Sequence, residues 1–301
     1  MEKNIFDVLI IGGSYAGLSA AMTLGRAIRK VLVVDAGEPC NAASPASHNF
    51  LTRDGENPLE IAAIGLEQVK AYPTVEHLNG KVQRIWKADE LFYAELSTGE
   101  QFEAKRILLA TGMKDILPDI EGFKACWGKT ILHCPYCHGY EVKGRRTGIL
   151  AKGEYGYNMA LMLFNWTKEL VIYTNGPHEF SEEHLQKLRA NSITIIDKVI
   201  EALEHDDGNI KAIRFKDGEQ SEEHLLYARV EYEQSSDIAE QLGCKLTETG
   251  HLFIEAAQET SVKGVYAAGD NNSIARSVSL AIGEGTKAGL AINADLVEEE
   301  F

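Results

Sequence analysis

The chain has 301 residues, a length that suits two domains of ordinary size better than a single core. Its 45 acidic and 30 basic residues give a formal net charge of −15 at pH 7, and such a field repels a nucleic acid backbone or an anionic membrane surface. The longest apolar runs are far too short to cross a bilayer. We therefore expect no nucleic acid partner and no membrane association, and, because no signal-like pattern precedes the first strand, a cytoplasmic location.

A strand, a helix and a second strand are predicted at the start of the chain. Phe6–Ile11 is almost continuously apolar, as in a strand buried on both faces of a parallel sheet. Leu18–Ile28 is rich in Ala and Leu, which favours a helix, and Lys30–Val34 reads as another buried strand. Together these elements form a βαβ unit.

The turn that leads into this helix is rich in glycine. Its residues are Gly12, Gly13, Ser14, Tyr15, Ala16 and Gly17, which fit G-x-G-x-x-G except at the second glycine. Gly12 allows a tight turn, Ser14 is small enough to lie beside a pyrophosphate, and Gly17 lets the helix pack closely on the sheet. Free N–H groups of the helix then face the phosphates, and Asp35, followed by Ala36, ends the second strand where a carboxylate binds ribose hydroxyls. A plain βα turn is the alternative, but this context favours a dinucleotide site.

Between Val82 and Gly112 the pattern changes to short alternating stretches. Leu91–Leu96 and Gln101–Ala104 are predicted to form an antiparallel excursion. A separate apolar strand is expected at Arg106–Ala110, followed by Thr111-Gly112.

A second βαβ pattern begins near residue 147. It predicts a strand at Gly148–Ala151, a turn at Lys152–Gly156, a helix at Tyr157–Trp166 and a strand at Leu170–Tyr173. A further helix is expected at Ser181–Asn191.

The pattern changes once more near residue 233. A strand at Gly264–Ala268 runs into Gly269-Asp270, a helix at Ser277–Asp295 closes the chain, and the acidic run Glu298–Glu300 is expected to be a solvated tail. The fold class is α/β, with two Rossmann-like dinucleotide-binding domains, the second inserted in the first. The expected division is 1–115 with 233–301, and 116–232 as the inserted module.

Five cysteines are present, and Cys134 and Cys137 are spaced C-x-x-C. With the histidine that follows, this is the attachment signature of c-type haem, which normally needs an exported chain. The flanking His133 and His138 suggest zinc, but such consecutive ligands are sterically awkward and no second ligand pair follows, so we expect no metal site. The third interpretation is a redox dithiol, in which the thiolate is the nucleophile of disulfide exchange.

Together with the glycine turn, two further segments resemble the FAD domain of the flavoprotein disulfide reductases that carry two dinucleotide domains. One is Ala110-Thr111-Gly112, and the other is V-Y-A-A-G-D at Val265–Asp270. The resemblance implies that Asp270, after Gly269, bonds the ribityl-phosphate part of FAD. It also implies that the helix beginning near Ser277 and Val278 points its positive end at the flavin.

The stretch H-C-P-Y-C-H-G-Y-E at 133–141 resembles the low-molecular-weight thioredoxin reductase family, and the resemblance covers nearly the whole chain. It implies that Cys137 exchanges electrons with the flavin, that Cys134 attacks an outside disulfide, and that the protein is a homodimer. The family usually carries Asp after the second cysteine, where this chain has His138.

C-P-Y-C-H-G-Y-E, with Ser47–Gly55 upstream, more closely resembles a side branch that includes the dithiol oxidases of disulfide natural products. His138 is a candidate general base because imidazole titrates near neutral pH, although it can equally serve only to hydrogen-bond the backbone. His48 is expected only as a neighbour of the flavin.

The second glycine turn is a poor NADPH site. Ala151 replaces its first glycine, Glu154 brings a carboxylate towards the pyrophosphate, and Thr174-Asn175-Gly176 offers no arginine for a 2′-phosphate. We therefore expect an FAD enzyme that passes two electrons between the cysteine pair and a thiol or disulfide substrate, either a small dithiol or a thioredoxin-like protein. A conventional NADPH-dependent thioredoxin reductase and a flavin-bound redox sensor remain the alternatives.

Overall fold

A computed structural model describes residues 5–301. The chain divides into two compact units. The first unit contains the residues up to Ala42, Phe50–Lys114 and Tyr232–Phe301, and the second contains Ala43–Asn49 and Asp115–Glu231. Residues 43–49, which the sequence assigns to the first unit, therefore group with the second.

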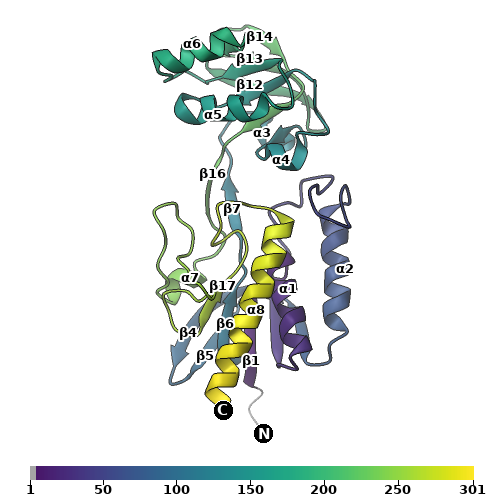
Figure 1. Ribbon diagram of the computed structural model, residues 1–301, viewed down its shortest axis with the longest axis vertical. Coiled ribbons are helices and arrows are strands. Elements are labelled where there is room, and N and C mark those ends of the chain that lie inside the picture. The colour runs from purple at the N-terminus through teal and green to yellow at the C-terminus, as the bar shows by residue number, and fades with distance from the viewer. Residues whose placement is uncertain (1–4) are drawn as a thin grey trace. The chain divides into compact units, whose positions relative to one another are not determined.

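The first unit is built on a seven-stranded sheet in which five strands run parallel and two form the antiparallel excursion (Figure 1). The order is β3-β2-β1-β6-β5-β4, and β17 pairs with β6. The strands are β1 (Ile5–Ile11), β2 (Val31–Asp35), β3 (Val75–Asn79), β4 (Val82–Ala88), β5 (Leu91–Leu96), β6 (Gln101–Leu109) and β17 (Val265–Ala267).

One strand, β6, replaces the two strands expected at Gln101–Ala104 and Arg106–Ala110. Its first half pairs antiparallel with β5, where Phe92 faces Ala104. Beyond that stretch the same edge pairs parallel with β17, while the other edge pairs parallel with β1 from Glu103 onward, where Ile10 faces Leu108. The sequence of this strand alternates between apolar and polar residues at first and is continuously apolar later. This hydrophobic pattern changes because the neighbouring strands change, while the backbone of the strand continues without a break.

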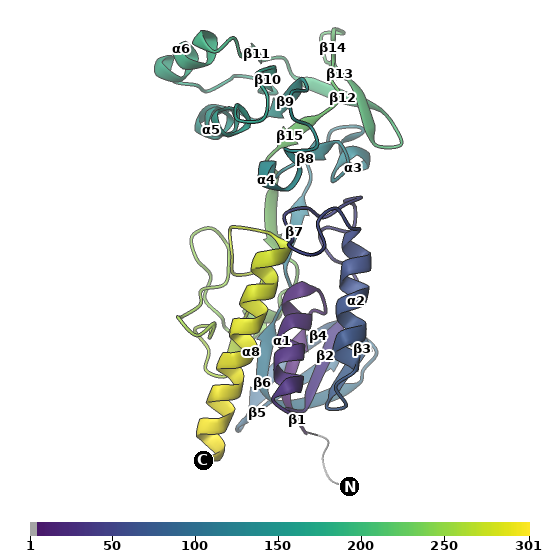
Figure 2. The same ribbon diagram turned by 45° about the vertical axis from the view of Figure 1, so that its right-hand side comes forward.

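Three helices cover one face of this sheet (Figure 2): α1 (Tyr15–Arg26), α2 (Pro58–Lys70) and α8 (Val278–Glu300). The short helix α7 (Ile238–Gln241) lies near β4. Successive strand residues alternate between the helix side and the opposite side, as Val31 and Leu32 do. The helices α1 and α8 can pack closely because Gly285 has no side chain. A Cβ at this position would lie 2.1 Å from the carbonyl oxygen of Ala16.

The acidic end of the chain is not the solvated tail that the sequence suggests. Helix α8 continues to Glu300. Glu299 pairs with Arg106, and Glu300 lies 2.7 Å from the guanidinium of Arg29. Both arginines are buried, at 8% and 9% exposure, so each needs an anionic partner, and the last turn of α8 provides it.

The second unit contains a five-stranded sheet with the order β11-β10-β9-β15-β8 and a three-stranded sheet with the order β12-β13-β14. Helices α5 and α6 lie on one side of the five-stranded sheet and β12–β14 on the other (Figure 2). Its strands are β8 (Ile131–Leu132), β9 (Thr147–Leu150), β10 (Leu170–Tyr173), β11 (Thr194–Ile196), β12 (Ile200–Asp206), β13 (Asn209–Phe215), β14 (Gln220–Glu222) and β15 (Leu226–Ala228). Its helices are α3 (Phe123–Cys126), α4 (Pro135–His138), α5 (Gly153–Leu163) and α6 (Glu182–Ala190).

Two predicted helices begin earlier than expected, and for the same reason. Helix α1 begins at Tyr15 and α5 at Gly153, within the stretches that the sequence assigns to turns. In each case the last glycine of the motif, Gly17 or Gly156, already lies in the first helical turn and packs against the end of the preceding strand or its turn. The glycine pattern therefore marks the start of the helix rather than the loop before it.

The chain passes between the units along β7 (Met113–Ile116) and β16 (Glu231–Gln234), which pair as a two-stranded sheet. No helix within residues 5–301 is long and apolar enough to cross a membrane.

Candidate functional site

The glycine turn of the first unit requires glycine at two positions. Gly12 has a φ of +106°, and a Cβ there would lie 2.2 Å from the carbonyl oxygen of Ala110. A Cβ on Gly17 would lie 1.9 Å from the carbonyl oxygen of Gly12. Because backbone oxygens cannot move aside, only glycine fits at these two positions. The turn is therefore tight enough for a dinucleotide pyrophosphate to lie close to the backbone.

The start of α1 is open to an anion. The preceding residue, Ser14, makes no side-chain capping hydrogen bond, and no acidic residue lies in the first turn. The amides of that turn have no partner within the helix, as at any helix start. Beside them, Asp35 Oδ1 accepts a hydrogen bond from Gly13 N at 3.0 Å, which places a carboxylate at the turn, with Ala36 exposed after it. This arrangement fits the pyrophosphate and ribose of FAD.

The other expected FAD segments lie in the same unit. Ala110-Thr111-Gly112 follows β6, and Asn271 Nδ2 donates to the carbonyl oxygen of Leu109 at 2.8 Å, which ties the end of β6 to the turn after β17. Asp270 lies 3.1 Å from the guanidinium of Arg276. Helix α8 begins at Val278 and is capped by Ser277 Oγ, which accepts from Leu280 N at 3.2 Å.

Two neighbours of Asp270 were not predicted from the sequence. Arg276 pairs with it, and the thiol of Cys40 donates to its Oδ2 at 3.7 Å. A lone cysteine or arginine in a loop carries no pattern that would have revealed either contact.

The redox pair lies at the short helix α4 in the second unit. Cys134 and Cys137 form a disulfide, and both side chains are partly exposed. The backbone N–H of Cys137 donates to Cys134 Sγ at 3.1 Å. After reduction such a donor stabilises a thiolate on Cys134, because it lowers the cost of the negative charge.

Glycine is also required just after the pair. A Cβ on Gly139 would lie 2.5 Å from the carbonyl oxygen of Pro135 and 2.9 Å from the ring of Trp166. Among the described residues no group of three or more His, Cys, Asp or Glu side chains is placed to hold a metal ion.

His138 follows the pair and contacts a residue from a distant part of the chain. Its ring meets that of His48 edge to face, with centroids 6.1 Å apart, and His48 Nδ1 lies 3.6 Å from Glu141 Oε1. The pKa of His138 lies below its ordinary value, chiefly because burial disfavours the charged ring, and also because of the nearby His48, while Glu141 partly opposes this shift. His138 is therefore a neutral imidazole near pH 7, able to accept a proton.

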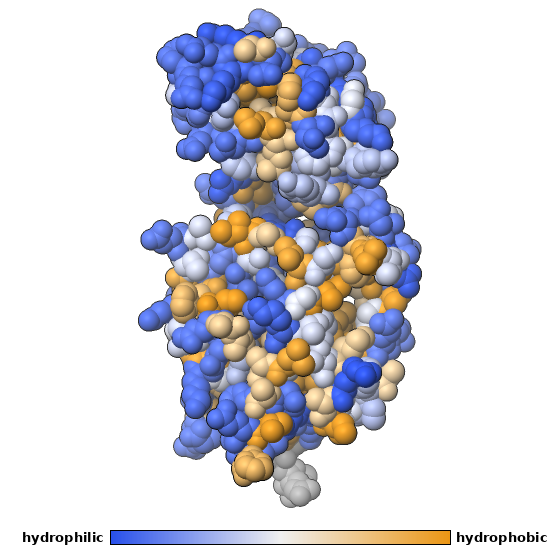
Figure 3. All heavy atoms as spheres, in the orientation of Figure 1, coloured by the Kyte–Doolittle hydropathy of each residue, from blue (hydrophilic) through white to orange (hydrophobic). Residues whose placement is uncertain are grey.

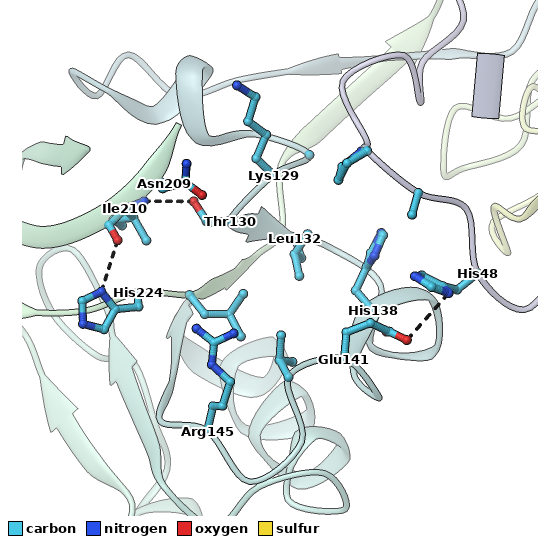
Figure 4. A pocket seen from close by; sticks show the side chains of 15 residues that line it. His48, Lys129, Thr130, Leu132, His138, Glu141, Arg145, Asn209, Ile210 and His224 are labelled. Carbon is cyan, nitrogen blue, oxygen red and sulfur yellow. Dashed lines mark hydrogen bonds and ion pairs between the residues drawn. The ribbon is translucent and has the colours of Figure 1, made fainter. Parts of the chain in front are cut away.

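His48 itself lies in the second unit, with the redox helix. The sequence proposes it only as a flavin neighbour, and the separation along the chain hides its contact with His138. Beside these two histidines the second unit has a pocket, shown in Figure 4.

At the second glycine turn, a loop of the same chain occupies the start of the helix, and we call this turn closed. The N–H of Gly153, the first residue of α5, donates to the carbonyl oxygen of His178 at 2.8 Å. Lys152 pairs with Glu179, and Glu154 adds a carboxylate to the first turn of the helix. The sequence does not reveal that the loop around His178 returns to this helix end.

The polar groups that follow β10 are also used internally. Thr174 Oγ1 donates to the carbonyl oxygen of Gly176 at 2.6 Å, and Asn175 Oδ1 accepts from Ile200 N at 2.8 Å. These contacts shape the turn and leave no cationic side chain at 174–176 to meet a phosphate.

The predicted site residues thus fall into two groups. The glycine turn, Asp35, Ala110–Gly112, Gly269-Asp270 and Ser277-Val278 belong to the first unit. The second unit holds Cys134, Cys137, His138 and His48.

Comparisons with known proteins agree with this chemistry. Residues 6–285 match the family model "Pyridine nucleotide-disulphide oxidoreductase". A thioredoxin reductase of Claviceps purpurea, tcpT, is 33% identical over 99% of this chain and 96% of its own length. The crystal structure of a putative thioredoxin reductase, TrxB, from Bacillus anthracis is 33% identical, with a TM-score of 0.94 over 98% of this chain and 100% of that one.

An oxidoreductase structure from Agrobacterium tumefaciens is 35% identical, with a TM-score of 0.91 over 97% of this chain and 99% of that one. The family resemblance and the fold class inferred from the sequence are confirmed. The chain belongs to the pyridine nucleotide-disulphide oxidoreductase family and is an FAD-dependent disulfide oxidoreductase of the thioredoxin reductase type.

Proposed function

We propose that this enzyme oxidises a dithiol to a disulfide through Cys134 and Cys137 and makes little use of NADPH. The observation that carries the proposal is the closed start of α5. There the Gly153 amide is bonded to His178 and the surrounding side chains include Glu154 and Glu179. The resemblance of C-P-Y-C-H-G-Y-E to the dithiol oxidase branch supports the same direction of electron flow.

The missing phosphate contacts give the size of the effect. Hydrogen bonds to charged groups are worth about 1.5–3 kcal/mol each, so two absent bonds to a 2′-phosphate lower affinity about 10²- to 10⁴-fold. The carboxylates at the start of α5 act in the same direction, because they repel the pyrophosphate.

The cysteines have separate roles in the proposed reaction. A substrate thiolate attacks Cys134 Sγ, which breaks the Cys134–Cys137 bond, forms a mixed disulfide and releases the Cys137 thiolate. The second substrate thiolate then attacks the substrate sulfur, which closes the product disulfide and releases Cys134 as a thiolate. The N–H of Cys137, 3.1 Å from Cys134 Sγ, stabilises that leaving group.

His138 is the proposed proton acceptor. Each substrate thiol must lose a proton before attack, and the lowered pKa of His138 keeps its imidazole neutral and able to take it. FAD, bound by the first unit, supplies the acceptor of the two electrons that reach the dithiol, and O₂ is the proposed final oxidant.

A conventional NADPH-dependent reductase of thioredoxin or a similar protein is the second candidate. It is favoured by tcpT, a relative that is named as a thioredoxin reductase. A flavin-bound redox sensor differs from both because it would be reduced once and cycle poorly.

We infer that the enzyme is a homodimer. Exposed apolar residues along α8 and at its end support this, because their spacings of ten, seven and four residues are sums of threes and fours and place them along one stripe of a helix. They are Leu280, Leu290 and Val297 in α8 and Phe301 directly after it. Figure 3 shows apolar residues along the course of α8 among charged ones. Leu290→Glu should convert the dimer to monomer in sedimentation velocity, and a wild-type monomer would refute the inference.

A cytoplasmic location fits the proposal, because the reducing pool there keeps dithiols available.

Oxygen uptake tests the proposed function. With dithiothreitol and no NADPH, the enzyme should consume O₂ over many turnovers, and Cys137→Ser should abolish this consumption. A single turnover would favour the sensor. Thioredoxin reduction that needs NADPH, without dithiol oxidation, would favour the conventional reductase.

A further inference from the structure

We infer that the pocket beside His138 binds a small thiol substrate that carries a carboxylate, and that Arg145 binds this carboxylate. The inference rests on the proposed function, since it concerns the substrate that reaches the redox pair. It adds the substrate class and a residue that selects it.

The pocket has the size of a small-molecule site. Its volume is about 470 Å³, within the range of roughly 300–1,000 Å³ that ligand pockets occupy. Every lining residue belongs to the second unit, so one compact unit defines its shape. A concavity of this size accommodates a small molecule.

The walls of the pocket combine apolar and charged surface. The apolar part suits the carbon skeleton of a small molecule. It is formed by Pro45, Ala46, Leu132, Val142, Ile210 and Leu225.

Arg145 provides the unbalanced charge. It lies between α4 and β9, and within residues 5–301 its side chain has no hydrogen-bond or ion-pair partner. Figure 4 shows it extending towards the interior of the pocket. Its exposed guanidinium is therefore available to an anionic group of a bound molecule.

Of the other charged groups of the lining, the cation Lys129 has an anionic partner, and Glu141 contributes a carboxylate on the side of His48 and His138. The contacts are Lys129 with Asp207, His224 with Glu222 at 3.0 Å, Glu141 with His48 at 3.6 Å, and the rings of His48 and His138.

A carboxylate is the ligand group that matches Arg145. A guanidinium binds a carboxylate through two parallel N–H···O bonds, which fix orientation as well as position. His138 lies on another side of the same pocket and directly follows Cys137 in the chain (Figure 4). A molecule held by its carboxylate at Arg145 would direct its thiols towards the proton acceptor.

Two matched dithiols test the inference in the full-length FAD-loaded enzyme. Dihydrolipoate and dihydrolipoamide carry the same thiols and differ in one charge, and kcat/KM for flavin reduction is measured anaerobically for each. Wild type should prefer dihydrolipoate, and Arg145→Ala should reduce this preference about 10- to 100-fold. Arg145→Lys should give an intermediate preference, because it keeps the charge and loses the two-pronged geometry. Arg189→Ala, which removes an exposed arginine of α6 that does not line the pocket, should keep the wild-type preference.

A binding measurement separates this inference from the proposed function. Octanoate and octanamide contain no thiol, so calorimetry reports their binding whether or not the enzyme oxidises dithiols. Octanoate should bind wild type at one site and bind Arg145→Ala about tenfold more weakly or worse, while octanamide should bind both proteins alike. Equal octanoate binding by wild type and Arg145→Ala would overturn the inference. Arg145-dependent octanoate binding by an enzyme that no dithiol reduces would instead overturn the proposed function alone.

Discussion

The two glycine turns of this protein share a strand–turn–helix layout and differ in what meets the helix start. In the first unit, the start of α1 has no side-chain cap and no acidic residue, and the turn is held by backbone contacts that only glycine permits. In the second unit, the carbonyl oxygen of His178 bonds the first amide of α5, and Glu179 pairs with Lys152 beside it. The comparison teaches that the same strand–turn–helix layout can leave the helix start open or occupy it with a loop of its own chain.

The comparison is sharpest at the last glycine of each turn. A Cβ on Gly17 would lie 1.9 Å from a backbone oxygen, whereas a Cβ on Gly156 would lie 3.2 Å from the nearest atoms of Ala151. Gly17→Ala should therefore destabilise the fold by about 3 kcal/mol and abolish FAD retention, while Gly156→Ala should change stability by about 1 kcal/mol or less.

Flavin absorbance per chain after gel filtration, together with urea unfolding, measures both variants. Equal flavin retention by the two would contradict the distinction between the turns.

The second unit contributes redox chemistry in this account, and His138 tests that contribution. His138→Ala should slow thiol–flavin exchange about 10²- to 10⁴-fold while FAD stays bound, since general acid–base groups typically contribute this much. Single-turnover stopped-flow absorbance gives the rate. A loss smaller than about threefold at every pH would leave His138 a structural residue.

The pH dependence of exchange tests the surroundings of His138. Because the pKa of its ring is below the ordinary value of 6.5, the neutral form persists below neutral pH and activity should fall only on further acidification. His48→Gln removes a neighbour that lowers this pKa, so the acid limb should move to higher pH. Glu141→Gln removes a neighbour that raises it, so the limb should move to lower pH.

The pH–rate profiles of both variants are compared with wild type, whose substrate ionisation they share. Shifts in the same direction would contradict the arrangement of the three side chains.

The smallest expected effect concerns the closed turn. Glu179→Gln removes one exposed carboxylate near the start of α5 and should strengthen NADPH binding about two- to fivefold. Glu183→Gln, an exposed carboxylate of α6 paired with Lys187, is the matched control and should leave binding unchanged. Quenching of intrinsic fluorescence gives the affinities, and equal gains in both variants would point to the overall charge instead.

The sequence predicted the elements whose signals are local. The strands predicted at 6–11, 30–34, 148–151, 170–173 and 264–268, the glycine turns and the C-x-x-C pair follow from apolar runs and short motifs, and the structure places them in the corresponding elements, whereas β3, β8, β11 and β15 were not predicted. The sequence failed where a partner from elsewhere decides the outcome. β6 stays continuous because β1 pairs along most of it while its other edge passes from β5 to β17, and the acidic end of α8 is ordered because Arg29 and Arg106 are buried beside it.

The same limit applies to the candidate site. Pattern alone indicated Cys134, Cys137 and His138, but not the contact of His48 with His138 or the return of the loop at His178 to α5. These contacts join residues far apart in the chain, and no short-range spacing encodes them.

The central claim is that thiols, rather than NADPH, reduce this enzyme. Anaerobic stopped-flow mixing tests it directly, with flavin absorbance as the signal. Millimolar dithiothreitol should bleach the flavin of the wild-type enzyme, and micromolar NADPH or NADH should leave it oxidised for minutes. Fast bleaching by micromolar NADPH would contradict the account and make the conventional thioredoxin reductase the correct assignment.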